Sequence, residues 1–409
     1  MKNKNILFQP FTQRQIQEII LVFLLLIATA VISIFSAYLF YTIKTEQEIE
    51  KEITYSGELE EFFDLYQKMT EEHYIDVDPN ILIKGAIKGM LEAFEDEYTT
   101  YIDDYDNYQF QQRMQGQYRG IGIGLYNNVD EEIEVTAVFP DSPAERAGVE
   151  IGDIIVAIDE QDLTEKDTQF LVEYIRDSEV DEVDMTFLRD GKEVNLKVEV
   201  DTVILSSVES EIIEKDNTKM GYLKISRFAI NTYQQVQEHL ETLEEEMDGL
   251  IIDLRHNTGG YLSTTRRIIS TFLDSSHVIF RTEEQGEEKV FYSTGNETKE
   301  YPIIILGNSY SASASEILIA ALQESYGAIF VGTKTYGKGT VQEMVDLEND
   351  DALRFTARIW LTPDGTWIDG EGVIPDYEVE QAAEYLLTLE RDDDAQFQKA
   401  IEVLLNKLN

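Results

Sequence analysis

The chain of 409 residues contains no cysteine and only four histidines. Without cysteine it can form no disulfide bond, no thiolate metal site and no cysteine nucleophile. None of the histidines belongs to an HxxxH-type ligand pair; they are His73, His239, His256 and His277. A metal-ion mechanism therefore has little support, and we expect no metal or other cofactor. Any catalysis must use other groups.

Basic residues are also few. The chain has 33 lysines and arginines against 80 aspartates and glutamates, which gives a formal charge of −47. This charge repels nucleic acid and anionic lipid, so we expect no nucleic acid partner. The acidity suits a solvated surface in a salty or alkaline medium, or the attraction of basic substrates. Hydrophobic residues make up 43% of the chain, enough for the cores of two or three domains.

One apolar run is long enough to cross a membrane. Residues 19–43 carry no charge, and a helix of this length spans roughly 30 Å of hydrocarbon. Basic residues precede the run and acidic residues follow it, so we predict a single-pass anchor with the rest of the chain outside the cytoplasm. A cleaved signal peptide is the alternative. An outward-facing chain without disulfides suggests a bacterial cell membrane.

Hydrophobic periodicity changes along the rest of the chain. Residues 57–115 show helical spacing, and from about residue 116 to 203 the pattern indicates a compact segment of short strands with two helices. Beyond it, apolar strands alternate with helices, which predicts parallel strands with helices packed against the sheet. The buried strands are expected at 249–254, 302–307 and 328–332. Catalytic residues in such folds tend to follow the carboxyl ends of the strands.

The stretch GTKTYGKGT, residues 332–340, resembles a phosphate-binding loop of the GxxxxGK type. Such a loop needs Ser or Thr directly after the lysine, where this chain has Gly339. It should also open into a helix, whereas the following residues predict a β-hairpin. We therefore consider a nucleotide site improbable on sequence grounds and look for another role for Lys338.

Ser313 follows a predicted buried strand and begins a predicted helix. With Glu316 it forms a Ser-x-x-Glu frame, which is typical of a helix capping box. The same position suits a nucleophile, because the amides at a helix N-terminus stabilise a developing oxyanion. With histidine so scarce, the candidate base is Lys338, whose pKa would have to fall to roughly 7–8 through burial. Gln342 lies on the same strand face and can orient the amine.

The stretch GLIIDLRHNTGG, residues 249–260, ends a buried strand in two glycines. Gly259 and Gly260 let the backbone approach a ligand closely, although a flexible turn explains them equally well. His256 lies nearby and is expected to be a packing or loop residue.

The motifs YRGIGIGL, SPAERAGVEIGDIIVAID, GYLKISRF, DLRHNTGG, SASASEI, YGKGTVQ and LTPDGTWIDGEGVIPD resemble those of the carboxy-terminal processing peptidases. These are envelope-associated serine proteases with an embedded PDZ domain, and the likeness covers roughly residues 60–378. It implies that Ser313 is the nucleophile, that Lys338 is the base and that Gln342 positions the base. It also implies an oxyanion hole formed by the amides of Ala314 and Gly260.

The resemblance implies a multidomain α+β fold with a mixed α/β protease core of the crotonase/ClpP-like type. The expected parts are a cytoplasmic N-terminus (1–18), the transmembrane helix (19–43), a helical region (44–115), a PDZ domain (116–203), the protease core (204–378) and a C-terminal helical segment (379–409). The PDZ domain is expected to be a sandwich or barrel with two helices. Its carboxylate-binding loop is expected at Gly120, Ile121, Gly122 and Ile123, with peptides bound by strand addition.

The predicted function is a membrane-anchored serine endopeptidase that cleaves near the C-terminus of protein substrates, with the PDZ domain as recognition element or gate. Its partners would be peptides with free C-termini, the membrane and a second copy of the chain in a homodimer. A catalytically silent PDZ scaffold is the alternative. Two motifs depart from the family pattern: Thr258 stands where proline is usual, and FEDEYTTYI, residues 94–102, lacks the usual proline, histidine and serines.

Overall fold

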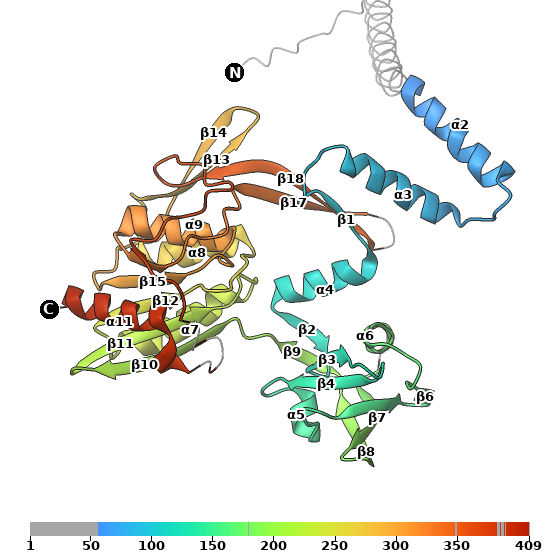
Figure 1. Cartoon of the computed structure of the whole chain (residues 1–409), viewed down its shortest axis with the longest axis horizontal. Coiled ribbons are helices and arrows are strands. Elements are labelled where there is room, and N and C mark those ends of the chain that lie inside the picture. The colour runs from blue at the N-terminus through green and yellow to red at the C-terminus, as the bar shows by residue number, and fades with distance from the viewer. Residues whose placement is uncertain are drawn as a thin grey trace, which may run out of the picture. The chain divides into compact units, whose positions relative to one another are not determined.

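The computed structural model describes residues 56–178, 180–347, 350–382, 385, 388 and 390–408. The chain divides into two compact units, residues 1–87 and 88–409. The first contains α2 (Ser56–Glu72) and the greater part of α3 (Pro79–Glu92) (Figure 1). Both helices fall where helical spacing predicts them, and both leave large apolar side chains exposed, among them Phe63 and Met90.

The predicted membrane anchor needs a correction. The run at residues 19–43 lies outside the described residues. Among the residues that are described, no helix combines the length and apolar character needed to cross a bilayer. This finding overturns the transmembrane helix in the predicted fold class, and with it the location in a bacterial membrane that was inferred from that helix.

The segment after α4 (Asp104–Gln115) is a small β domain with two helices, as predicted. Strands β2 (Gln117–Gly120) and β9 (Asp201–Ile204) pair at its entrance and exit. Its main sheet has the order β3-β4-β5-β7-β8, with β6 paired to β5. The remaining elements are β3 (Ile123–Asn127), β4 (Ile133–Val138), α5 (Pro143–Ala147), β5 (Ile154–Ile158), β6 (Gln161–Asp162), α6 (Thr168–Asp177), β7 (Glu182–Arg189) and β8 (Lys192–Glu199).

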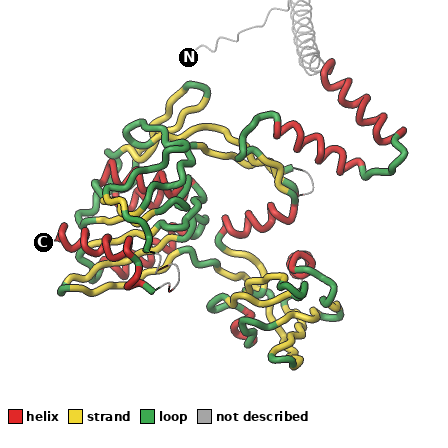
Figure 2. The backbone as a smooth tube through the Cα atoms, in the orientation of Figure 1, coloured by secondary structure: helices red, strands yellow, loops and turns green. Residues whose placement is uncertain are grey.

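The core of the second unit is a six-stranded sheet of order β10-β11-β12-β15-β16-β19, parallel except for the edge strand β10. The three strands predicted to be buried and parallel are β12, β15 and β16. The bounds are β10 (Val208–Lys215), β11 (Thr218–Ile225), β12 (Gly249–Asp253), β15 (Ile303–Gly307), β16 (Ile329–Gly332) and β19 (Tyr377–Glu378). Figure 2 shows the alternation of strand and helix through this core.

Helices cover both faces of this sheet because both faces are apolar. Leu250 and Ile252 of β12 pack with helices α7, α8 and α9 on one face, while Ile251 and Ile304 pack with α11 on the other. Alternate residues of a strand point to opposite faces, which is why the sequence shows unbroken apolar runs here. The helices are α7 (Thr232–Glu244), α8 (Leu262–Phe272), α9 (Ala314–Ala321), continued by a π-helical turn (Leu322–Tyr326), and α11 (Ala395–Leu408).

A second sheet of the core carries the predicted hairpin. Strands β17 (Thr340–Asp346) and β18 (Ala352–Leu361) pair antiparallel, as the sequence predicts. The sheet is completed by β1 (Thr100–Ile102), β13 (Val278–Glu284) and β14 (Glu287–Tyr292). Because β1 pairs with β18, it places residues 96–102 beside this hairpin, although more than 200 positions separate them in the sequence.

Candidate active site

The parallel strands β12, β15 and β16 end at one edge of the sheet, and the predicted catalytic residues follow them. The register pairs Asp253 with Leu306 and Gly307 with Gly332. The loops after the three strands therefore begin side by side. This is where ligands and catalytic groups of open α/β sheets are usually found.

Ser313 is the N-cap of α9 and is half-buried. Its backbone has φ 55° and ψ −115°, a region that non-glycine residues rarely occupy. Such strain persists only where the surroundings hold it, and it is common at functional sites. The carboxylate of Glu316 accepts a hydrogen bond from the Ser313 N–H at 2.7 Å. The helix cap predicted from the Ser-x-x-Glu frame is thus present at a strained turn.

The two predicted oxyanion donors belong to the segments that meet at this turn. Ala314 is the first residue of α9, so its N–H has no acceptor within the helix. Gly259 packs against the turn so closely that a Cβ on it would lie 3.2 Å from Cβ of Ser313. At Gly260, with φ 146°, a Cβ would lie 2.3 Å from the Phe228 carbonyl oxygen. Within the described residues neither the Ala314 nor the Gly260 N–H donates to a backbone carbonyl.

Asn257 holds this glycine turn, a role that no sequence pattern indicated. Its fully buried side chain accepts from the Gly259 N–H at 2.9 Å and donates to the Ile225 carbonyl at 2.8 Å. Its own carbonyl accepts from the Ala312 N–H at 3.0 Å. Thr258, at the position where proline is usual, is exposed. The turn is therefore fixed by the asparagine side chain beside it.

Glu316 links the serine turn to the lysine loop. Its carboxylate has no exposed surface and accepts four hydrogen bonds. The donors are the N–H groups of Ser313 (2.7 Å), Lys338 (2.9 Å) and Gly337 (2.6 Å) and the Thr335 hydroxyl (2.6 Å). Burial raises the pKa of the Glu316 carboxyl, although the four hydrogen bonds oppose this. One buried carboxylate thus fixes the backbone of both proposed catalytic residues.

The same contacts argue against a phosphate site in residues 332–340. The amides of Gly337 and Lys338, which would cradle a phosphate, are occupied by the Glu316 carboxylate. The loop then leads into strand β17 and not into a helix. The nucleotide interpretation that the GxxxxGK frame allows is therefore unsupported.

The amine of Lys338 lies in an environment that favours its neutral form. The side chain is half-buried, and burial together with the nearby cation of Arg354 lowers the pKa of Lys338 to about 8. The carboxylates of Asp96, Glu97 and Glu316 act in the opposite direction but do not cancel the effect. A lysine with this pKa can accept a proton near neutral pH.

Tyr98 covers this amine. The Lys338 Nζ lies over the Tyr98 ring, 4.2 Å from its centroid. In the described part of the chain, no hydrogen bond joins the side chains of Lys338 and Ser313. Tyr98 belongs to FEDEYTTYI, the stretch that departs from the family pattern. Its pKa is raised by burial and by a hydrogen bond with Tyr336, so the phenol stays protonated.

Gln342 is not brought to the lysine amine. In β17 its side-chain nitrogen donates to the hydroxyls of Thr340 at 2.8 Å and Thr356 at 3.3 Å. A bulge between Val341 and Gln342 shifts the strand register at this point. The extra residue at this bulge is Ala357 of β18, so the alternation of side chains along β17 is kept and Gln342 shares a face with Thr340. Lys338 lies before β17 begins at Thr340, and the even spacing therefore does not place its side chain on that face.

His256 is placed as a loop residue. Its ring stacks on Tyr310 with centroids 5.1 Å apart, and one ring nitrogen lies 3.2 Å from the side-chain nitrogen of Asn308. Both contacts hold the loop after β12 against the loop after β15. This agrees with the packing role that we expect for it.

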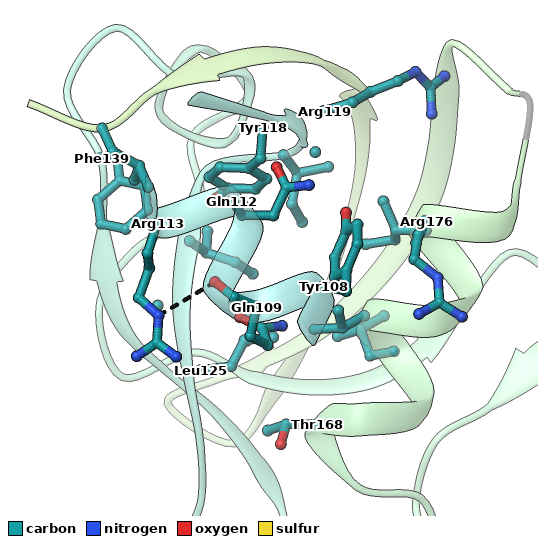
Figure 3. Close-up of a pocket in the computed structure, with 18 of the residues that line it drawn as sticks. Tyr108, Gln109, Gln112, Arg113, Tyr118, Arg119, Leu125, Phe139, Thr168 and Arg176 are labelled. Atoms are coloured by element: carbon teal, nitrogen blue, oxygen red, sulfur yellow. Dashed lines mark hydrogen bonds between the residues drawn. The ribbon is translucent and has the colours of Figure 1, made fainter. Parts of the chain in front are cut away.

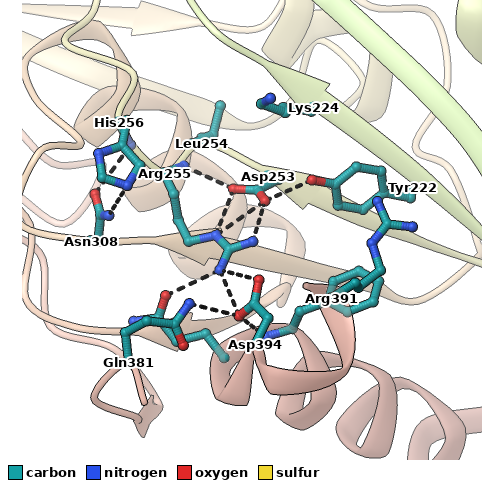
Figure 4. Close-up of polar contacts among 12 residues, drawn as sticks. Tyr222, Lys224, Asp253, Leu254, Arg255, His256, Asn308, Gln381, Arg391 and Asp394 are labelled. Carbon is teal, nitrogen blue, oxygen red and sulfur yellow. Dashed lines mark hydrogen bonds and ion pairs between the residues drawn. The ribbon is translucent and has the colours of Figure 1, made fainter. Parts of the chain in front are cut away.

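Arg255 ties the start of the glycine loop to the C-terminal segment (Figure 4). Its guanidinium pairs with Asp253 at 2.6 Å and with Asp394 at 2.8 Å. The hydroxyl of Tyr222 donates to Asp253 at 2.8 Å. Burial acts to lower the pKa of Arg255, but the two carboxylates outweigh it and raise the pKa. Sequence patterns did not reveal this network because Asp394 lies 139 residues away.

The predicted carboxylate-binding loop connects β2 to β3 in the small β domain. The carbonyl of Ile121 accepts from the Ala144 N–H, and that of Gly122 accepts from the Phe139 N–H. Gly122 has φ 86°, and a Cβ there would lie 2.3 Å from Cβ of Ser142. The loop borders a cavity of about 400 Å³, which is also lined by β3, α6 and α4 (Figure 3).

Three known family models match parts of this chain. Residues 219–379 match the model of peptidase family S41, and residues 120–200 match that of the PDZ domain. Residues 35–105 match the N-terminal domain of the activating protease CtpB. The S41 match contains the loops that carry Ser313, Lys338 and Gly260.

Curated relatives match most of the chain. The carboxy-terminal processing protease CtpB of Bacillus subtilis is 33% identical over 322 residues, which cover 77% of this chain and 66% of that protein. A probable CtpA-like serine protease of Staphylococcus aureus is 31% identical over 362 residues, 87% of this chain and 71% of that protein. The match thus spans slightly less than two thirds of the CtpB sequence.

The likeness to solved structures is weaker. The photosystem II D1 C-terminal processing protease superposes with a TM-score of 0.46 and 24% identity, over 78% of this chain and 86% of its own. The identity and extent of the sequence matches show that this chain belongs to peptidase family S41, the family of the carboxy-terminal processing proteases, and carries a PDZ domain.

Proposed function

We propose that this chain is a serine endopeptidase that cleaves protein substrates near their C-termini, with Ser313 as nucleophile and Lys338 as general base. The observation that supports it best is the Glu316 carboxylate, which binds the backbones of both residues while the Lys338 pKa is lowered to about 8. Acyl transfer needs at least a nucleophile and a base whose backbones are held in fixed positions relative to each other.

The chemistry follows from these groups. Neutral Lys338 takes the proton of the Ser313 hydroxyl as Oγ attacks the scissile carbonyl carbon. The amides of Ala314 and Gly260 stabilise the oxyanion that forms. The lysine ammonium then protonates the leaving amine, which gives an acyl-enzyme, and the neutral amine next activates a water to release the acid. Metal and nucleotide have no part in this scheme.

The scheme requires a side-chain movement. The Lys338 amine lies over the Tyr98 ring, so it must turn away from the ring to meet the Ser313 hydroxyl. We assign to Gln342 the task of holding the amine in that working position, which requires it to leave Thr340 and Thr356.

The PDZ domain acts in this proposal as recognition element and gate. Tyr98 lies only six positions before α4, and α4 lines the cavity beside the loop Gly120–Ile123. A tail bound there by strand addition would contact α4 and shift the segment that carries Tyr98. An uncleavable tail peptide should then raise the rate at which a short second substrate is cut. A Tyr98→Ala variant should be fast without the peptide.

We test the chemistry by cleavage of a labelled peptide with a free apolar C-terminus. Ser313→Ala should abolish cleavage, and Lys338→Arg should do the same because arginine keeps the charge but does not act as a base. Ser309→Ala and Lys334→Ala, two exposed neighbours, are matched controls and should stay active. An active Lys338→Arg variant refutes proton transfer by Lys338. Tail binding without cleavage by the unmodified chain favours the PDZ scaffold instead.

A homodimer is the last element of the proposal. Helices α2 and α3 expose apolar side chains that a second copy would cover, among them Leu59 at 51% and Phe63 at 60% exposure. Sedimentation equilibrium of the full chain should give the mass of two chains, and Phe63→Glu should reduce it to one. A monomer at all concentrations refutes this element and leaves the chemistry untouched.

A further inference from the structure

The cavity beside the PDZ loop has a charge opposite to that of the whole molecule. Four arginines line it, and no aspartate or glutamate is found among its lining residues. The chain as a whole has 80 acidic residues against 33 basic ones. A basic cavity in so acidic a chain is a local feature that the composition does not explain. It indicates an anionic occupant.

Two of the four arginines already have carboxylate partners. Arg176 pairs with Asp177 at 2.7 Å and also lies over the Tyr108 ring. Arg119 pairs with Asp181 at 3.6 Å and donates to the Ser178 carbonyl at 3.2 Å. These two side chains are therefore largely compensated.

The other two, Arg113 and Arg227, have no carboxylate partner in the described part of the chain. Arg113 donates only to the Gln109 carbonyl, four residues before it, at 3.2 Å. The half-buried side chain of Arg227 makes no hydrogen bond with a described residue; only its backbone carbonyl accepts one, from the Thr232 hydroxyl. Burial and the charge of Arg113 lower the pKa of Arg227. Two like charges thus face one cavity at an energetic cost that a bound anion would remove.

The position of this pair is fixed by backbone contacts. Arg113 lies in the last turn of α4, and Arg227 lies in the loop that follows β11. The two segments are joined by a hydrogen bond from the Ile230 N–H to the Met114 carbonyl at 2.9 Å. A second bond runs from the Asn231 side chain to the Gly116 carbonyl at 2.7 Å. The pair is therefore built from outside the PDZ fold.

The rest of the cavity suits an extended peptide with an apolar end. Leu125 of β3, Phe139 and Tyr118 supply apolar and aromatic surface (Figure 3). A volume of about 400 Å³ is in the range of ligand sites that hold a few side chains.

We propose that this cavity selects substrate tails that carry an acidic side chain upstream of an apolar C-terminal residue, and that Arg113 and Arg227 are the specificity-determining residues. The inference rests on the proposed function, because it takes the tail of a protein substrate as the occupant. Guanidinium groups bind carboxylates through charge-assisted hydrogen bonds, and a peptide with Gln in place of Glu cannot form them because its side chain is uncharged.

The test measures tail binding to the full chain with Ser313→Ala, so that no peptide is cut. Fluorescent decapeptides end in the same apolar residue and carry Glu or Gln at one of the second to fifth positions from the end. Binding is followed by anisotropy in 0.15 M salt, where the field of distant acidic residues is screened beyond about 8 Å. At one of these positions the Glu peptide should bind about tenfold more tightly than its Gln partner.

Variants of the arginines then assign this preference. Arg227→Gln and Arg113→Gln should each reduce the Glu-to-Gln ratio toward one and leave the affinity for the Gln peptide unchanged. Arg119→Gln is the matched control in the same cavity, and it should keep the ratio because that arginine is already paired. The unchanged affinity for the Gln peptide also shows that the variants are folded.

Three results overturn the inference. They are equal binding of Glu and Gln peptides at every position, a variant that weakens both peptides equally, and no binding of any tail. A separate assay tests the peptidase function in each case. If the unmodified chain cleaves an unstructured protein and the Ser313→Ala variant does not, the proposed peptidase function is supported even though the inference about the cavity is refuted. If instead the unmodified chain cleaves nothing but still binds the Glu peptide more tightly than the Gln peptide, the proposed peptidase function is refuted and the selectivity of the cavity is supported.

Discussion

The dependence of activity on pH is the most direct test of Lys338 as the base. The lysine must be uncharged to accept the Ser313 proton, so activity is present above its pKa and is lost as the pH falls through it. With a pKa of about 8, roughly one molecule in ten carries a neutral Lys338 at pH 7. At the ordinary value of 10.5 the fraction would be about one in 3,000. The site therefore supplies about 300 times more of the reactive form.

The assay is kcat/KM for a labelled tail peptide between pH 6 and pH 10, because this ratio reports the pKa of the free enzyme. We expect a tenfold rise per pH unit at low pH, a midpoint near 8 and a plateau above it. A profile that is flat from pH 6 upward, or that still rises steeply at pH 10, would refute the argument. In the first case the lysine is not the base, and in the second its surroundings do not lower its pKa.

Two substitutions near Lys338 should move the midpoint in opposite directions. Arg354→Gln removes a cation that lowers the Lys338 pKa, so the midpoint should rise. Asp96→Asn removes a carboxylate that raises it, so the midpoint should fall. Each shift is expected to be roughly half a pH unit, typical of one charge in a partly solvated site. Shifts of the same sign in both variants would show that structural change, and not charge, controls the profile.

Three further substitutions test the frame around the dyad. Glu316→Gln replaces the carboxylate by an amide, which cannot accept from all four donors. It should lower the free energy of unfolding by about 2–4 kcal/mol and kcat by at least a hundredfold. An unchanged urea unfolding curve would contradict this. Asn257→Ala leaves the buried Gly259 N–H and the Ile225 carbonyl unpaired. It should lower the free energy of unfolding by about 1–3 kcal/mol, measured by urea unfolding, and should lower kcat more than it alters KM. Asp394→Asn leaves Arg255 with one carboxylate partner. We expect the free energy of unfolding to fall by about 3 kcal/mol and hydrogen exchange in α11 to become faster. Equal exchange rates in the variant and the unmodified chain would show that this ion pair does not hold α11 in place.

Much of the core could be predicted from sequence because its signals are local. The apolar runs of β12, β15 and β16 reflect burial on both faces, and that burial is visible within five residues. The β17–β18 hairpin and the helix beginning at Ser313 follow from turn and capping residues in the same way. For these elements local preference and tertiary packing agree.

The contacts that build the site could not be predicted in this way. Glu316 is recognisable as a capping residue, but its bonds to residues 335–338 depend on how α9 returns to β16. Tyr98 reaches Lys338 only because β1 pairs with β18 across the chain. Gln342 points to Thr340 as strand alternation predicts, but the strand begins only at Thr340, so the alternation does not extend back to Lys338. The contacts of Glu316 and Tyr98 thus join segments that are distant in sequence.

The four-donor carboxylate of Glu316 also limits how this centre can be turned off. The main chains at the serine and at the lysine cannot separate without breaking bonds to a group that is wholly shielded from water. If the proposed mechanism holds, an inactive form is therefore reached most easily when the Lys338 side chain rotates onto the Tyr98 ring while both loops keep their positions. In the proposed mechanism, such a resting enzyme keeps both loops assembled and needs only the side chains of Lys338 and Gln342 to rotate before it can react.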